Sequence, residues 1–201
     1  MFNSKEYWEN RYKNGGNSGS GSYGILSEYK ANIINNFIIK NNIKSVVEFG
    51  CGDGNQLEKI KCDKYTGYDV SETIVDICKK KFEDDKNKSF YLYNNYYNEK
   101  YDLSLSLDVI YHLIEDDIFE DYMFKLFNSS NEFIIIYSSD GDIILDNISS
   151  HIFDRNFTKW IEKNIKNFNL IEKINNKYKY NDMRDNLNSS ISNFFIYKNT
   201  K

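Results

Sequence analysis

The chain has 201 residues, of which 40% are hydrophobic and 28% are charged, and its formal net charge at pH 7 is −4. These proportions are typical of one folded domain with a sizeable core, and they exclude a mainly disordered chain. The lysines are dispersed, which argues against a nucleic-acid partner, so we expect a small-molecule substrate. No apolar run is long enough for a membrane span and no secretory signal pattern is present, so we expect a cytoplasmic protein. Nothing in the composition indicates an oligomeric state.

Two elements are expected before the first strand. Aromatic residues at helical spacing predict a short helix within residues 2–13. Half of the segment 15–24 is glycine, and this composition fits both a flexible linker and a mobile lid that closes over bound cofactor and substrate. Tyr23, near the end of this segment, is a candidate substrate contact. Residues 25–40 have one apolar face and predict an amphipathic helix.

A glycine-rich turn follows a short apolar strand that we expect at residues 46–49. The glycines of this turn are Gly50, Gly52 and Gly54, and the next residues are compatible with a helix at 56–60. In an open parallel sheet such a turn lies at the carboxyl end of the strand, where bare backbone and its amide groups can face a ligand.

The residues around this turn separate two classes of cofactor. Asp69 follows Gly50 by 19 positions and ends the next expected strand, where an acid can bind ribose hydroxyls. A nicotinamide or flavin fingerprint would require glycine at position 55, which is Asn55. The motif from Glu48 to Gly54, together with Asp69, resembles the first two motifs of the class I S-adenosylmethionine (SAM)-dependent methyltransferases. This resemblance covers the chain from about residue 25 to its end.

The resemblance implies a fold and a cofactor. The implied fold is α/β and doubly wound, with a mostly parallel seven-stranded sheet, helices on both faces and a C-terminal antiparallel strand pair. We expect one SAM-binding domain over residues 1–201, with SAM as the cofactor and S-adenosyl-L-homocysteine (SAH) as its product. The residues expected to bind the cofactor are Glu48, Gly50, Cys51, Gly52, Asp69, Val70, Asn94, Ser106, Leu107 and Asp108.

The rest of the chain alternates between expected strands and helices. Ser71 is expected to cap a helix, and acids at 115–117 suit the start of another. A further helix is expected near 157–165. Strands are expected at residues 65–70, 90–93, 133–137, 170–174 and 191–197, and the fourth strand together with its exit loop is expected at residues 101–113.

The loop after the fourth strand holds the first catalytic candidates. The resemblance places an active-site residue at Asp108, with Tyr111 as a nearby substrate contact. Methyltransferases that act on adenine or glutamine amino groups often carry a proline-containing loop here, and this chain has no proline, which disfavours those substrates.

The chain has two histidines, and both are candidates for a catalytic base. His112 is expected near the cleft, where packing or cofactor contact is favoured over base catalysis. His151 and Arg155 could together bind an anionic group of the substrate, with the histidine as base, or could be incidental polar groups before a helix. Asp140, Asp142 and Asn147 resemble the magnesium-binding acids of catechol-type O-methyltransferases, but their spacing differs and a polar turn explains them, so we predict no metal.

We therefore predict an enzyme that transfers the methyl group of SAM to a small polar acceptor. The favoured reaction is O-methylation of a sugar, a glycan precursor or a phosphorylated metabolite. One alternative is a noncatalytic SAM-binding or scaffolding domain, and another is a nucleic-acid or protein methyltransferase. A nucleotide-dependent enzyme of the same fold is a further alternative, which Asn55 argues against.

Overall fold

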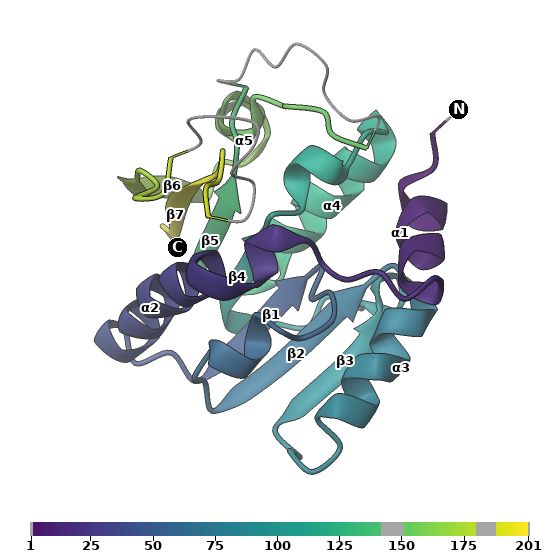
Figure 1. Ribbon diagram of the computed structural model, residues 1–201. Helices are drawn as coiled ribbons and strands as arrows, with labels where there is room; N and C mark the ends of the chain where they lie inside the picture. The colour runs from purple at the N-terminus through teal and green to yellow at the C-terminus, as the bar shows by residue number, and fades with distance from the viewer. Residues whose placement is uncertain (1, 142–150, 180–187, 201) are drawn as a thin grey trace.

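A seven-stranded mixed sheet organises the chain (Figure 1). The computed structural model describes residues 2–141, 151–179 and 188–200. The strand order is β3-β2-β1-β4-β5-β7-β6. β7 pairs antiparallel with both β5 and β6, and the other pairings are parallel. The strands are β1 (Ser45–Phe49), β2 (Lys64–Asp69), β3 (Lys88–Leu92), β4 (Tyr101–Leu107), β5 (Ser130–Ser138), β6 (Phe168–Ile174) and β7 (Asn193–Asn199). The predicted fold class is confirmed.

Helices cover both faces of this sheet, and each face has its own hydrophobic core. On β5, Ile134 and Ile136 pack into one core, whereas Ile135 and Tyr137 pack into the other, because successive side chains of a strand point to opposite faces. The first core receives residues of α4 and α5, and the second receives residues of α2 and α3. The helices are α1 (Ser4–Lys13), α2 (Gly24–Lys40), α3 (Glu72–Lys81), α4 (Asp116–Asn128) and α5 (Phe157–Asn164).

The connection between β1 and β2 differs from the prediction. We expected a helix at residues 56–60, but the chain makes only a 3₁₀ turn, η2 (Leu57–Lys59). The glycine turn leaves nine residues, 55–63, before β2 begins. After β1 the chain must run back along the length of that five-residue strand, about 17 Å, before β2 can begin. Nine residues in an α-helix would span only about 14 Å. The connection is therefore too short for the expected helix.

The helix after β2 begins as predicted. The Ser71 hydroxyl accepts a hydrogen bond from the backbone N–H of Ile74, which satisfies an otherwise unpaired donor of the first turn of α3. Asp69 thus lies between the end of a strand and the start of a helix. Among the described residues, none of the helices is long and apolar enough to cross a membrane.

Candidate active site

A cavity lies where the carboxyl ends of β1, β2 and β4 meet, and it encloses about 960 Å³ of space including its open mouth. Its position is the one expected for ligands in open parallel sheets. α1 forms its cover, because Ser4, Trp8 and Tyr12 line the cavity. The helix predicted within residues 2–13 therefore lies over the site.

Hydrogen bonds from the middle and from the first residue of α1 hold the helix across the cavity. The Glu9 carboxylate accepts from the Ser71 hydroxyl at 2.5 Å and from the Thr73 hydroxyl at 2.8 Å, at the start of α3. At the first residue, the backbone N–H of Ser4 donates to Glu115 Oε1 at 2.8 Å, just before α4. These contacts tie the cover to the two helices that flank the mouth.

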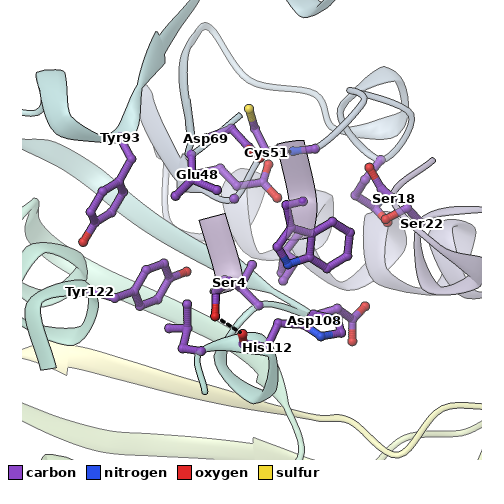
Figure 2. A pocket seen from close by; sticks show the side chains of 18 of the residues that line it. Ser4, Ser18, Ser22, Glu48, Cys51, Asp69, Tyr93, Asp108, His112 and Tyr122 are labelled. Carbon is purple, nitrogen blue, oxygen red and sulfur yellow. Dashed lines mark hydrogen bonds between the residues drawn. The ribbon is translucent and has the colours of Figure 1, made fainter. Parts of the chain in front are cut away.

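The cavity has distinct sides (Figure 2). Tyr93 and Tyr122 lie on one side, and Ser18 and Ser22 lie on the opposite side. Asp69 lies between them. A ligand with several chemical parts, each facing different side chains, would fit such an arrangement.

The glycine turn forms the floor of the cavity. Gly50 N–H donates to Tyr68 O at 2.7 Å, and Gly52 N–H donates to Asp69 Oδ2 at 3.0 Å. Gly52 has φ +55°, and a Cβ there would overlap the Ser18 hydroxyl. Only glycine gives the backbone this conformation and this close approach without strain.

Two buried acids line the cavity beside the turn. Asp69 accepts from Gly52 N–H and from Ser71 N–H at 3.0 Å, and burial raises the pKa of its carboxyl to about 6. Glu48 accepts from the Tyr65 hydroxyl at 2.6 Å, and burial raises its pKa to about 7. Negative charge in this part of the cavity is costly without a partner, so a positively charged ligand would stabilise it.

Asp108 connects three segments at the end of β4. Its Oδ2 accepts from the Lys30 ammonium of α2 at 2.7 Å. Its Oδ1 accepts from the Tyr111 hydroxyl at 3.0 Å and from the Ser192 hydroxyl, just before β7, at 2.9 Å. Asp108 lines the cavity as predicted, but both of its oxygens are already bonded, so it is poorly suited to accept a proton from a substrate.

His112 lines the cavity in a defined tautomer. Its Nδ1 lies 2.9 Å from His151 O, and because a carbonyl can only accept, Nδ1 carries the proton. Burial lowers the pKa of His112 to about 4, so the ring is neutral at pH 7. The Trp8 ring meets it edge-on at a centroid distance of 4.9 Å. In the part of the chain that the structure describes, Nε2 has no hydrogen-bond partner and is an available acceptor.

The structure separates His151 from Arg155. The His151 ring stacks on Tyr7 at 4.9 Å and on His112 at 5.4 Å, and it does not line the cavity. Arg155 donates from Nε and Nη2 to backbone carbonyls of the loop before α4 and from Nη1 to Asp116 Oδ1 at 2.6 Å. The guanidinium thus holds this loop, and the expected anion site does not form at the cavity.

The remaining expected cofactor residues fall in different places. Three of them line the cavity: Cys51, Val70 and Leu107. Ser106 is buried and accepts from the Tyr122 hydroxyl at 2.7 Å, away from the lining. Asn94 is exposed and outside the lining, whereas its neighbour Tyr93 takes the position at the cavity. The cofactor roles of Ser106 and Asn94 stay predictions.

The glycine-rich segment packs on the turn. The backbone N–H of Ser18 donates to Asp53 Oδ2 at 2.9 Å, and Asp53 N–H donates to Ser18 Oγ at 2.8 Å. The Tyr23 hydroxyl donates to the same carboxylate oxygen at 2.7 Å. Tyr23 thus anchors the segment to the turn and does not itself line the cavity.

The acids after β5 show no cation site in the described part of the chain. Asp140 accepts from the backbone N–H of Thr158 at 2.9 Å and from its hydroxyl at 2.6 Å, at the start of α5. Asp142 and Asn147 lie outside the described residues. In the described ranges, no cluster of three or more histidine, cysteine or acidic residues could hold a metal ion.

Sequence reasoning missed several polar residues of the lining, and the two that lie buried in α2 and just after the glycine turn are Lys30 and Gln56. Lys30 stands on the buried stripe of α2 between Leu26 and Ile34, at a spacing of four residues. A lysine in such a stripe is the signal that could have identified it, since buried lysines need a partner. Gln56 follows the glycine turn without any periodic pattern, so no sequence signal marks it.

Comparisons with known proteins agree with this geometry. A family model described as a methyltransferase domain matches residues 47–124, which include the glycine turn, Asp69 and the loop after β4. A comparison with curated proteins finds no significant match.

Solved structures share the fold at low sequence identity. A magnesium protoporphyrin IX methyltransferase (ChlM) from Synechocystis, with bound SAH, has a TM-score of 0.67 and 12% identity, with 97% of each chain covered. The N-methyltransferase NodS from Bradyrhizobium japonicum, in complex with SAH, has a TM-score of 0.65 and 12% identity, with 87% of this chain and 86% of that chain covered. A putative RNA methyltransferase from Pyrococcus horikoshii has a TM-score of 0.59 and 10% identity, with coverages of 86% and 84%.

These three proteins are named for different substrates or acceptor atoms, so the shared fold does not indicate the acceptor. Residues 47–124 thus match a methyltransferase domain, and the chain has the mostly parallel seven-stranded fold of the solved methyltransferases.

Proposed function

We propose that this enzyme transfers the methyl group of SAM to a hydroxyl oxygen of a small, uncharged polar acceptor such as a sugar or glycan precursor. The observation that carries the proposal is the fixed tautomer of His112. Its Nδ1–H is held by His151 O, which leaves Nε2 as a proton acceptor at the wall of the cavity. An acceptor hydroxyl loses a proton during methylation, so it needs such a group.

The residues of the cavity fit the cofactor. The Asp69 carboxylate accepts from the backbone N–H groups of Gly52 and Ser71, and a carboxylate has further lone-pair sites that can accept from a ribose hydroxyl. The glycine turn brings bare backbone to the cavity, where Gly50 and Gly52 form part of the lining. Glu48 and Asp69 supply negative charge, whereas SAM carries a net positive charge, so the electrostatics are complementary.

SAM supplies a methyl group that its sulfonium already activates, so the protein needs no covalent intermediate. The chain must align the acceptor, exclude water and take up the proton. α1 covers the cavity and keeps bulk water from the reacting atoms. The Trp8 ring of this helix packs against the His112 ring in a T-shaped contact, which helps to fix the position of the imidazole. His112 Nε2 would take the hydroxyl proton as the carbon–oxygen bond forms and the methyl–sulfur bond breaks, with SAH as the leaving group.

The lining also bears on the charge of the acceptor. Lys30 is buried and paired with Asp108, so this pair adds no net charge to the reacting end. Arg155 and His151, the residues expected to bind a phosphate or carboxylate, do not line the cavity. Lys5 also lines the cavity, but it is exposed, so the buried part of the cavity fits an uncharged hydroxylated molecule better than a phosphorylated one.

The test is transfer of labelled methyl from SAM to a panel of methyl glycosides, matched sugar phosphates, amines and carboxylic acids. We expect labelled ethers from the uncharged glycosides and little product from the phosphates. Labelled amines or esters without labelled ethers would refute the proposal, and binding of SAM without turnover on any acceptor would favour the noncatalytic alternative.

Two variants assign the proton acceptor. His112→Asn should lower kcat by about 10²- to 10⁴-fold and leave SAM binding intact. His151→Phe keeps the stacked ring and the backbone carbonyl that orients His112, so it should retain most of the activity. The opposite pattern would assign the base to His151. At saturating SAM, the acidic limb of the kcat profile should lie near pH 4, because burial lowers the pKa of His112 to about 4.

A further inference from the structure

The loop between His112 and α4 carries two parts of the site. His112 lies at its start, and Glu115, which accepts from the backbone N–H of Ser4, lies at its end. The Ser4 hydroxyl also donates to His112 O at 3.1 Å, so the first residue of α1 contacts both ends of this loop. The helix before the loop, η4 (Ile110–His112), is a single 3₁₀ turn, and such short turns have few hydrogen bonds of their own. The position of the loop therefore depends on contacts from other segments.

Arg155 supplies two of these contacts from one rigid group. Its Nε donates to Leu113 O at 3.0 Å, and its Nη2 donates to Ile114 O at 2.6 Å. A guanidinium is planar and presents its N–H donors in a fixed fork. The carbonyls of two adjacent residues are therefore held in one orientation relative to the Arg155 side chain.

The surroundings of the guanidinium fix it in turn. Its Cζ lies 4.7 Å from the centre of the Phe119 ring, on α4, and 4.6 Å from the centre of the Phe153 ring. The Arg155 side chain is 12% exposed, whereas its ion-pair partner Asp116 is 87% exposed. Ion pairs with an exposed partner contribute little because solvent screens them. We therefore expect the bonds to the two carbonyls, and not the ion pair, to hold the loop.

We propose that Arg155 is a positioning residue for His112: it holds the loop so that the imidazole keeps one orientation and presents Nε2 to the cavity. The Arg155 side chain does not itself line the cavity. Its own segment supports this role, since His151 O binds His112 Nδ1 and the backbone N–H of Phe153 donates to Tyr111 O at 2.7 Å. The inference rests on the proposed function, because that function makes the position of the His112 ring matter for the rate.

Arg155→Ala tests this role through rate, binding and rescue. In methyl transfer to a methyl glycoside we expect kcat to fall by about 10- to 100-fold, because a displaced base acts less well on the acceptor hydroxyl. The Kd of SAH in calorimetry should change by less than about threefold, since Arg155 lies outside the cavity. Added guanidinium ion, well below denaturing concentrations, should restore part of the rate, whereas sodium chloride at the same ionic strength should not. An unchanged kcat, or an equal loss of SAH affinity, would overturn the inference.

Two variants separate the carbonyl bonds from the ion pair. Asp116→Asn removes the ion pair and keeps both bonds to the carbonyls, so kcat should stay within about twofold of wild type. Arg155→Lys keeps the positive charge, but a single ammonium cannot reproduce the planar fork, so it should lose nearly as much rate as Arg155→Ala. If Arg155→Ala does not fold, Arg155→Lys carries the same test. Full activity in Arg155→Lys, or the same loss in Asp116→Asn, would show that charge alone matters and would refute the positioning role.

The tautomer of His112 separates this inference from the proposed function. Proton–nitrogen correlation NMR spectra at neutral pH need no acceptor, and the spectrum of His151→Phe assigns the His112 signals. In wild type the proton should lie on Nδ1, and in Arg155→Ala we expect a mixture with the Nε2–H form, because the ring no longer keeps one orientation toward His151 O.

The two failures give different results. If His112→Asn retains its activity while Arg155→Ala changes the tautomer, the proposed function fails and the positioning role stands. If His112→Asn loses its activity while Arg155→Ala leaves both the tautomer and kcat unchanged, the positioning role fails and the proposed function stands.

Discussion

Replacement of Glu48 by glutamine tests the electrostatics of the cavity through protein stability. Glutamine keeps the size of the side chain and can still accept the hydrogen bond of the Tyr65 hydroxyl, but it cannot titrate. Burial raises the pKa of Glu48 from 4.5 in the unfolded chain to about 7 in the fold. At a pH between these two pKa values, Glu48 is protonated in the folded protein and ionised in the unfolded chain. The contribution of Glu48 to stability is therefore present at low pH and is lost as the pH rises.

The size of the effect follows from the two pKa values. Going from pH 5 to pH 8, the contribution of Glu48 to the free energy of unfolding should fall by about 2 to 3 kcal/mol. The assay is urea denaturation of ligand-free wild type and Glu48→Gln at several pH values. The difference between the two proteins isolates this one group, because other titrating groups such as His112, whose lowered pKa acts in the opposite direction, cancel.

We expect the advantage of wild type over the variant to shrink by this amount as pH rises, with most of the change between pH 5 and 7. Unfolding free energies that run parallel for the two proteins across the whole range would refute the reasoning. They would mean that the Glu48 carboxyl ionises in the fold much as it does in the unfolded chain, and that the cavity does not penalise a negative charge.

Two further predictions concern the groups around the glycine turn. Asp69→Ala should weaken SAM binding by about 1 to 4 kcal/mol, because it removes one or two hydrogen bonds to the ribose, and unchanged affinity in calorimetry would contradict the role of Asp69. Gly52→Ala should lower the free energy of unfolding by at least about 1 kcal/mol, since φ is +55° and the added methyl group overlaps the Ser18 hydroxyl. Gly15→Ala, also at positive φ but with open space around the position, is its control: if both variants lose the same stability, backbone strain alone explains the effect.

The strands and the glycine turn could be predicted because their signals are local. Short apolar runs bounded by glycine or polar residues mark β1 and β4, and a serine before an acidic first turn marks the start of α3. Asp69 and Asp108 were predicted for the cavity and line it, since both follow directly from the end of a strand. Local patterns of this kind predict where a strand ends and a turn begins. In a parallel sheet, the turns at the carboxyl ends of the strands form the ligand site.

The rest of the site depends on packing between distant segments. Lys30 and Gln56 reach the cavity only because α2 lies against the short connection after β1, and no local pattern encodes that contact. The prediction of a helix at 56–60 was wrong. The distance that the chain must cover before β2 decides the conformation of this connection, whereas the helical preferences of its residues do not. The expected pairing of His151 with Arg155 assumed one helical surface, but α5 begins only at Phe157, and the two side chains point to different neighbours.

The short connection between β1 and β2 makes α2 a reporter of cofactor binding. The amides of Gln56 and Asn35 link η2 and its neighbouring residues to α2 directly, so the glycine turn and a helix from an earlier part of the chain move as one unit. A ligand that binds only the folded state raises the free energy required to open this unit. SAH should therefore slow amide hydrogen exchange along α2, including turns far from the cavity, as strongly as in the glycine turn itself.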